Sequence, residues 1–128
     1  MNTPPLDFGL TAVPGIEVGH CEVANGASGC SVVLARESAV AGVDVRGGAP
    51  GTREIALLDP VNTVQKIHAV ALSGGSAFGL DTASGVMRYL ADHRIGVEIV
   101  GQVVPIVAGA VLFDLGVSDV PDNHPGRD

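Results

Sequence analysis

The segment Ser73–Met87, SGGSAFGLDTASGVM, constrains the fold of this chain more than any other stretch. It follows an apolar run, His68–Leu72, and it leads into apolar positions at helical spacing. An apolar run without regular polar alternation predicts a strand that is buried on both faces. The segment therefore indicates a strand, a tight glycine-containing turn and a helix in direct succession.

The helix is predicted from Ser76 to about His93. Gly79 and Gly85 inside it would each cost about 1 kcal/mol relative to alanine, which indicates close contact with a neighbouring sheet or pocket. The apolar positions that recur along one face are Leu80, Ala83, Val86, Met87 and Leu90.

Short β-branched runs elsewhere predict further strands, and Thr52 is expected to cap a brief helix over 53–58 that Asp59–Pro60 ends. Strands, a helix and then more strands indicate an α+β or layered α/β fold. The expected strands are 16–18, 30–35, 39–45, 67–72, 97–100 and 103–107.

No repeat or composition shift marks a second domain, so residues 1–128 are predicted to form a single domain. Residues 1–14, with their Pro and Gly breaks, are expected to form an extended arm. Residues 117–128 read as a polar tail that adds nothing to the core.

Composition excludes several classes of function. The chain is 46% hydrophobic but only 3% aromatic, so its core must be built from Val, Ala, Leu and Ile. A net charge of −7 with Lys66 as the only lysine argues against nucleic-acid binding. Because no apolar stretch reaches membrane-spanning length and Met1–Pro5 lacks a secretory pattern, we expect no membrane association and a cytoplasmic location.

The two cysteines, Cys21 and Cys30, lie nine residues apart. A disulfide is one alternative, and free thiols are favoured for a cytoplasmic protein. Since the chain has no CxxC pair and no second cluster, we expect no metal site.

Three kinds of chemistry fit the glycine-serine junction at Gly74, Gly75 and Ser76. A phosphate cradle is disfavoured, because only Gly79 matches the dinucleotide fingerprint counted from Gly74 and no Lys-Ser/Thr pair follows. A nucleophile elbow begins correctly at Ser76, but Phe78 stands where its last glycine belongs. The third alternative is a set of bare backbone amides that donate to a carboxylate or an oxyanion, with the nucleophile supplied from elsewhere.

Ser76 also has a purely structural alternative, because it could simply cap the helix. If Ser76 were instead a nucleophile, any of the four histidines could serve as its base, so their presence decides nothing. His68, in an apolar strand, is expected to be a hydrogen-bonded core residue rather than a catalytic base.

Several blocks, in order and spacing, resemble the self-processing L-aminopeptidase/D-esterase family, which includes the P1-type and β-peptidyl aminopeptidases and the nylon-oligomer hydrolases. The resemblance runs from about residue 11 to about residue 120. The blocks are Gly15–His20, Val43–Gly48, Asp59–Pro60 with Asn62–Val64, Ala71–Leu80, Val104–Val107 and Leu112–Leu115.

The resemblance implies a layered αββα sandwich of the N-terminal-nucleophile type. Such proteins cut their own backbone before a Ser or Thr, whose hydroxyl then attacks the substrate carbonyl while its α-amino group acts as base. No cofactor is implied. Since family members are much longer, this chain resembles their N-terminal portion only, with the nucleophile on a downstream segment, and Asn62–Thr63 is not expected to be the cleaved bond.

Two further residues are candidates for binding, each with a structural alternative. Arg46 would hold a substrate carboxylate, or pair with Asp44 or Glu54 to pin a loop. Asn62 would orient a carbonyl, or begin a turn after Pro60.

Two further candidates follow the last predicted strand. Phe113 stands where nylon-oligomer hydrolases carry a tyrosine whose hydroxyl faces the active site. Either another group replaces that hydroxyl, or the pocket is drier and its substrate different, or Phe113 packs in the core. Asp114 would close a polar network near the pocket, or cap the turn at Gly116.

Together these patterns predict the scaffold and substrate pocket of an aminopeptidase or amidase. Gly74, Gly75, Ser76, Asn62 and Phe113 are the pocket candidates. The expected partners are the C-terminal chain with the nucleophile, a small peptide, amide or ester substrate, and a second copy of the protein through uncovered apolar sheet. The alternatives are a non-catalytic small-molecule binding or assembly module and a Ser76-centred serine hydrolase.

Overall fold

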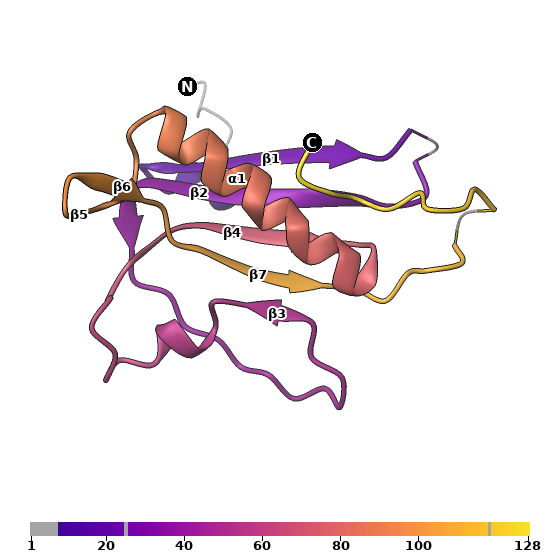
Figure 1. Ribbon diagram of the computed structural model, residues 1–128, viewed down its shortest axis with the longest axis horizontal. Coiled ribbons are helices and arrows are strands. Elements are labelled where there is room, and N and C mark those ends of the chain that lie inside the picture. The colour runs from indigo at the N-terminus through magenta and orange to yellow at the C-terminus, as the bar shows by residue number, and fades with distance from the viewer. Residues whose placement is uncertain (1–7, 25, 118) are drawn as a thin grey trace, which may run out of the picture.

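The computed structural model describes residues 8–24, 26–117 and 119–128. In these ranges one α-helix crosses one face of a five-stranded sheet (Figure 1). The sheet strands are β1 (Ile16–Glu22), β2 (Gly29–Ala39), β3 (Thr52–Arg53), β4 (Ile67–Ser73) and β7 (Val107–Val111). The other elements are the hairpin of β5 (Val97–Ile99) and β6 (Gln102–Val104), the helix α1 (Thr82–Asp92), and the 3₁₀ turns η1 (Leu10–Ala12), η2 (Ala56–Leu58) and η3 (Ser76–Asp81).

The sheet is mixed, with the spatial order β1-β2-β4-β7-β3. Its β1–β2, β2–β4 and β3–β7 pairs are antiparallel, whereas β4 and β7 are parallel. Because parallel strands end at the same edge of a sheet, the segments that leave β4 and β7 emerge side by side. This edge positions the candidate site.

The helix α1 buries its predicted apolar face against the centre of the sheet. Ala83 and Leu90 pack on Ala69, Ala71 and Val107, and Leu90 and Val107 are fully buried. Alanines on both surfaces allow the helix and the strands to approach closely, which explains a core with so few large side chains. The helical face predicted from the sequence is therefore confirmed.

The opposite face of the sheet is only partly covered. The segment between β2 and β4 packs Leu57 and Leu58 on Ile67 and Ala108. Further along β4, Leu72 lies on the same side as Val70, which packs in this cluster, and it remains 47% exposed. The described residues therefore supply one helix layer and one sheet layer, which confirms the α+β class.

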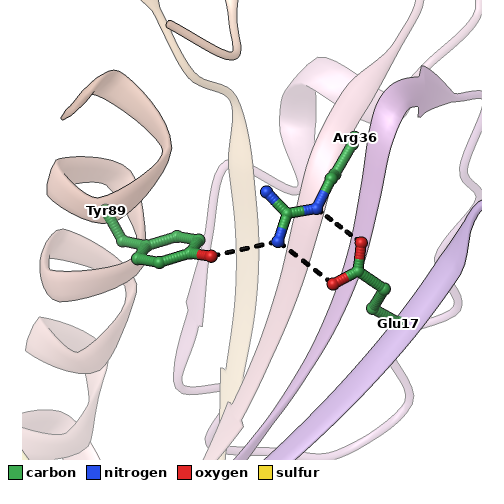
Figure 2. A network of polar contacts seen from close by, with 3 residues as sticks. All are labelled: Glu17, Arg36 and Tyr89. Carbon is green, nitrogen blue, oxygen red and sulfur yellow. Dashed lines mark hydrogen bonds and ion pairs between the residues drawn. The ribbon is translucent and has the colours of Figure 1, made fainter. Parts of the chain in front are cut away.

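A polar network joins α1 to the strands at the β1 edge (Figure 2). The guanidinium of Arg36 on β2 donates to both carboxylate oxygens of Glu17 on β1, at 2.5 and 3.1 Å. The same group donates to the hydroxyl of Tyr89 on α1 at 3.0 Å. The hydrogen bond from Arg36 holds the pKa of Glu17 below its usual range. One arginine thus fixes three elements relative to one another.

The long helix predicted from Ser76 is wrong in its first part. Residues Ser76–Asp81 form η3, and α1 begins at Thr82, whose hydroxyl donates to the carbonyl of Gly79 at 2.8 Å. Ser76 does not cap α1, whose N-cap is Asp81; it is the first residue of η3, after the N-cap Gly75, and has φ of +52°. The close packing around the glycines imposes this tighter turn.

Two other predicted elements differ for tertiary reasons. Strand β2 runs without interruption to Ala39 through a register shift near Ser38, which has φ of +65°, and residues 40–45 then leave the sheet. Of the helix predicted over 53–58, only the last turn is helical, as η2, which ends before Asp59 as predicted. Thr52 and Arg53 instead pair with β7 as a short edge strand. Local propensity did not reveal that β7 offers an unpaired edge at this point.

The predicted strand over 103–107 is divided at Pro105, which lacks an N–H, into β6 and β7. Both ends of the chain also differ from expectation. Residues 1–7 of the predicted arm lie outside the described residues, and η1 occupies part of the remainder. The tail is not purely peripheral, because Pro125 is buried and His124 stacks on Phe78 with ring centroids 4.5 Å apart.

Candidate functional site at the carboxyl edge of the central strands

The glycine-serine junction lies where β4 ends, beside the segment that leaves β7. Ser73 pairs with Val111 in the parallel ladder. The Leu112 amide donates to the Ser73 carbonyl at 2.8 Å, which prolongs the contact beyond β7. Asp114, predicted to join a polar network near the pocket, is brought to the junction by this pairing.

All three amides predicted to be bare donors are used within the chain. The amide of Gly74 donates to the carbonyl of Gly29 at 2.9 Å, and that of Ser76 donates to the carbonyl of Leu112 at 2.9 Å. The amide of Gly75 donates to Oδ1 of Asp114 at 2.6 Å. The prediction of free backbone donors at this turn is therefore wrong in this structure.

The turn does bind an anion, and that anion is the carboxylate of Asp114. Its Oδ2 accepts a hydrogen bond from the hydroxyl of Ser28 at 2.7 Å, in addition to the Gly75 amide on Oδ1. These hydrogen bonds, first from Gly75 and then from Ser28, hold the pKa of Asp114 below its usual range. A charged side chain thus ties the β1–β2 hairpin, the end of β4 and the end of β7 together.

The close packing at the junction explains why positions 74, 75 and 79 are glycines. A Cβ at Gly74 would overlap both Oδ2 of Asp114 and the hydroxyl oxygen of Ser28. A Cβ at Gly79 would overlap the carbonyl oxygen of Gly74. Gly75 has φ of +81°, and a Cβ there would lie 2.9 Å from Cβ of His124. The junction requires residues without side chains because backbone and polar groups fill the space beside it.

A cavity of about 540 Å³ lies next to this junction. Its wall is formed by the end of the β1–β2 hairpin together with residues 72–74 and 110–112. Gly74 and Ser73 therefore line an open space while their backbone groups remain bonded to neighbouring strands. The junction acts as a fixed wall of the cavity and not as its donor group.

Several polar side chains of the cavity were not singled out from the sequence. His20 on β1 and Ser31 on β2 are paired in the strand register, and their Nδ1 and Oγ atoms lie 2.7 Å apart. Glu22 also lines the cavity, on the same strand as His20. Alternation along β1 would place His20 and Glu22 on one face, but only the register of the hairpin brings Ser31 opposite His20.

Asn62, by contrast, lies far from the junction. It precedes β4, whose seven residues span about 23 Å, whereas the junction follows that strand. Its side-chain amide donates to the carbonyl of Ala56 at 2.6 Å, and its backbone amide donates to Asp59. Of the two roles considered for Asn62, the turn after Pro60 is the one that the structure shows.

Arg46 and Phe113 are both exposed. Nε of Arg46 lies 2.5 Å from a carboxylate oxygen of Asp44, and both residues line a second cavity of about 360 Å³ above β4 and β7. Phe113 follows β7 and is 81% exposed, so its ring does not pack in the core that the described residues form. Its neighbour Leu112 is 71% exposed, which gives the edge beside Asp114 an apolar surface.

The histidines do not support a Ser76-centred site. His68 is buried, as predicted, and its Nδ1 accepts the amide of Ile106 at 3.1 Å; burial lowers its pKa. His93 and His124 contact the backbone carbonyls of Tyr89 and Pro125, and His20 contacts Ser31. Among the described residues, no histidine hydrogen-bonds the Ser76 hydroxyl.

The described ranges contain neither a metal-binding cluster nor a membrane-spanning helix. No three His, Cys, Asp or Glu side chains gather there in a metal-binding arrangement. No helix in those ranges combines the length and apolar character needed to cross a bilayer.

Comparison with known proteins decides the family. The model of peptidase family S58 matches residues 9–126, nearly the whole chain. The chain belongs to peptidase family S58. The resemblance inferred from the sequence blocks is thereby confirmed.

Relatives within the comparison differ in their named activities. The chain is 52% identical over 118 residues to an uncharacterized aminopeptidase of Mycobacterium leprae, and 53% identical over 116 residues to one of Mycobacterium tuberculosis. These alignments cover 86% and 84% of the chain but 33% and 34% of the relatives. A 6-aminohexanoate-oligomer endohydrolase of Paenarthrobacter ureafaciens is 29% identical over 120 residues, covering 89% of the chain and 30% of that relative. The chain thus spans about one third of the length of the curated relatives it matches.

Proposed function

We propose that this chain forms the N-terminal scaffold and part of the substrate pocket of an N-terminal-nucleophile hydrolase. The complete protein would cleave aminoacyl amide, peptide or ester bonds. The observation that carries this proposal is the match of residues 9–126 to a peptidase family, together with the relative of Mycobacterium leprae, which is about three times as long as the part it shares with this chain.

The carboxyl edge of β4 and β7 is the proposed pocket wall. Ser28, Asp114 and Gly75 hold this edge in one geometry through hydrogen bonds of 2.6 and 2.7 Å. A substrate beside a rigid wall loses less orientational freedom on the way to its transition state. The exposed Leu112 and Phe113 would offer it an apolar surface.

The open face of the sheet is the proposed contact with the rest of the protein. Leu72 on β4 and the cavity beside it face away from α1, so a second sheet packed there would complete a layered αββα sandwich. Removing this apolar surface from water would stabilise the complete protein.

The reaction would use a downstream Ser or Thr that self-cleavage turns into a new N-terminus. Its hydroxyl would attack the substrate carbonyl, and its α-amino group would take the hydroxyl proton. The leaving amine or alcohol would depart with a proton, and water would then release the acyl group from the enzyme. With the amides of Gly74–Ser76 already bonded, the donors to the oxyanion would come from the downstream segment.

The full-length protein provides the test. We expect it to split into two polypeptides and to hydrolyse aminoacyl p-nitroanilides, aminoacyl esters or 6-aminohexanoate oligomers. Alanine at the new N-terminal Ser or Thr should abolish both processing and turnover, whereas Ser76→Ala should retain them.

The isolated 1–128 polypeptide serves as the matched negative sample, because it lacks the proposed nucleophile. Robust turnover by this polypeptide, or loss of activity in Ser76→Ala with intact processing, would refute the downstream nucleophile.

A further inference from the structure

Cys21 and Cys30 face each other across the first hairpin. They are partners in the register of β1 and β2, directly opposite in the antiparallel ladder. Both are free thiols, with Cys21 exposed and Cys30 partly buried. Both line the 540 Å³ cavity beside the glycine junction. The two cysteines thus share one face of the hairpin, the face that carries α1, and they lie in the strand ends that form the cavity wall.

We propose that Cys21 and Cys30 form a reversible disulfide that changes the wall of this cavity with the redox state of the surroundings. Opposite residues in an antiparallel pair share one face, with Cβ atoms about 4.5–5.5 Å apart. A disulfide needs Cβ atoms about 3.5–4.5 Å apart, so the bridge requires a small local approach of the two strands. A bridge formed under such strain is readily reduced again, as in regulatory disulfides.

The two thiols are suited to different steps of the exchange. Cys21 is exposed, so its thiolate would attack a sulfur of a low-molecular-weight disulfide such as oxidised glutathione and release one glutathione thiolate. The Cys30 thiolate would then attack Sγ of Cys21 and release the second glutathione. Two protein thiols are oxidised and one glutathione disulfide is reduced to two thiols. Burial, together with the neighbouring Cys21, raises the pKa of Cys30, so the exposed Cys21 is expected to react first.

The bridge would act on the junction through the hairpin. Cys30 pairs with Ser73 on β4, and the neighbouring carbonyl of Gly29 accepts the amide of Gly74 at 2.9 Å. Ser28, two residues before Cys30, donates to Asp114. Drawing β1 and β2 together therefore moves groups that hold the Gly74–Gly75 turn and alters the cavity.

The full-length protein is incubated with oxidised or reduced glutathione, its remaining thiols are alkylated, and it is digested after glutamate. Cleavage after Glu17, Glu22 and Glu37 places Cys21 and Cys30 on separate peptides, 18–22 and 23–37. We expect roughly tenfold more of the linked peptide pair in the oxidised than in the reduced sample, and its complete loss after dithiothreitol.

A matched control moves one thiol by a single residue. In the double variant Cys30→Ser with Ser31→Cys, the thiol changes to the other face of β2 but keeps the same sequence neighbourhood. We expect this variant to take up glutathione without forming the linked pair.

Equal amounts of linked peptide in the variant and the parent would overturn the proposal, as would glutathione on both parent cysteines without a link. A bridge that persists in excess dithiothreitol would overturn its reversibility. Since the readout is covalent, the result does not depend on whether the protein hydrolyses any substrate.

Discussion

At the scale of the residue, Asp114 both lies at the candidate site and holds the glycine turn beside it in place. Its carboxylate accepts hydrogen bonds from the Gly75 amide and the Ser28 hydroxyl, which come from two other parts of the chain. Hydrogen bonds to a charged group contribute more than neutral ones. The negative charge is therefore part of what holds the glycine turn closed.

Replacing Asp114 by asparagine is expected to lower the free energy of unfolding by about 1–2 kcal/mol, since the charge that both donors address is lost. Chemical denaturation at neutral pH measures the change. Asp44→Asn is the control, because its pair with Arg46 is exposed on the surface and should contribute little. Equal losses in the two variants would contradict the supporting role of Asp114.

The difference in stability between the parent protein and Asp114→Asn is also expected to depend on pH. The pKa of Asp114 is lowered in the folded state, so its stabilising effect is present above the unfolded value of about 3.9. The effect is lost as the pH falls through the folded pKa. The stability curves of the parent and Asp114→Asn should therefore converge in acid, and a constant difference would argue against an ionised Asp114.

Protonation of His68 is expected to give a second pH dependence of the free energy of unfolding, over a different pH range. Burial lowers its pKa, and its Nδ1 accepts the Ile106 amide, so folding favours the neutral ring. Stability from this site is present above about pH 6.5 and is lost as the pH falls toward the folded pKa. We expect His68→Asn to flatten this part of a denaturation-versus-pH curve, while His93→Asn, at an exposed position, leaves it unchanged.

At the scale of the element, the apolar pattern of α1 was readable in the sequence, but the partners of short strands were not. Leu90 and Ala83 fall on the face that the helical period predicts. Thr52 and Arg53 carry a weak helical signal, yet they pair with Ala110 and Gly109 on β7. A two-residue strand is decided by the edge it meets, and its own residues contain too little information to reveal that edge.

Leu90 tests the contact between α1 and the sheet. Leu90→Ala should reduce the free energy of unfolding by about 2–5 kcal/mol, because a fully buried side chain is replaced by a cavity. The exposed Arg88→Ala, two residues away on the same helix, should change it by about 0.5 kcal/mol or less. Thermal and chemical unfolding measure both changes. Equal losses for Leu90→Ala and Arg88→Ala would contradict the packing of Leu90 against the sheet.

At the scale of the whole molecule, one face of the sheet is covered by α1 and the other is partly open. Leu72, Leu112 and Phe113 are exposed at 47%, 71% and 81% along this open side and its edge. Exposed apolar surface on this scale is typical of a contact with further protein.

The 1–128 polypeptide made alone should therefore self-associate at micromolar concentration in sedimentation velocity. Adding the C-terminal part of the protein in trans should replace this self-association with a defined complex. A single monomeric species across the concentration range would contradict the open-face interpretation.

By itself the sequence determined the main strand-turn-helix unit, the buried face of α1, the core position of His68 and the family. These features depend on local periodicity and on residue types that lie close together along the chain. Only the tertiary structure decided that Asp114 is the anion at the glycine turn, that Asn62 lies at the other end of β4, and that Cys21 faces Cys30. The reason is physical: strand register and the parallel pairing of β4 with β7 bring together groups whose separation along the chain carries no signal of their contact.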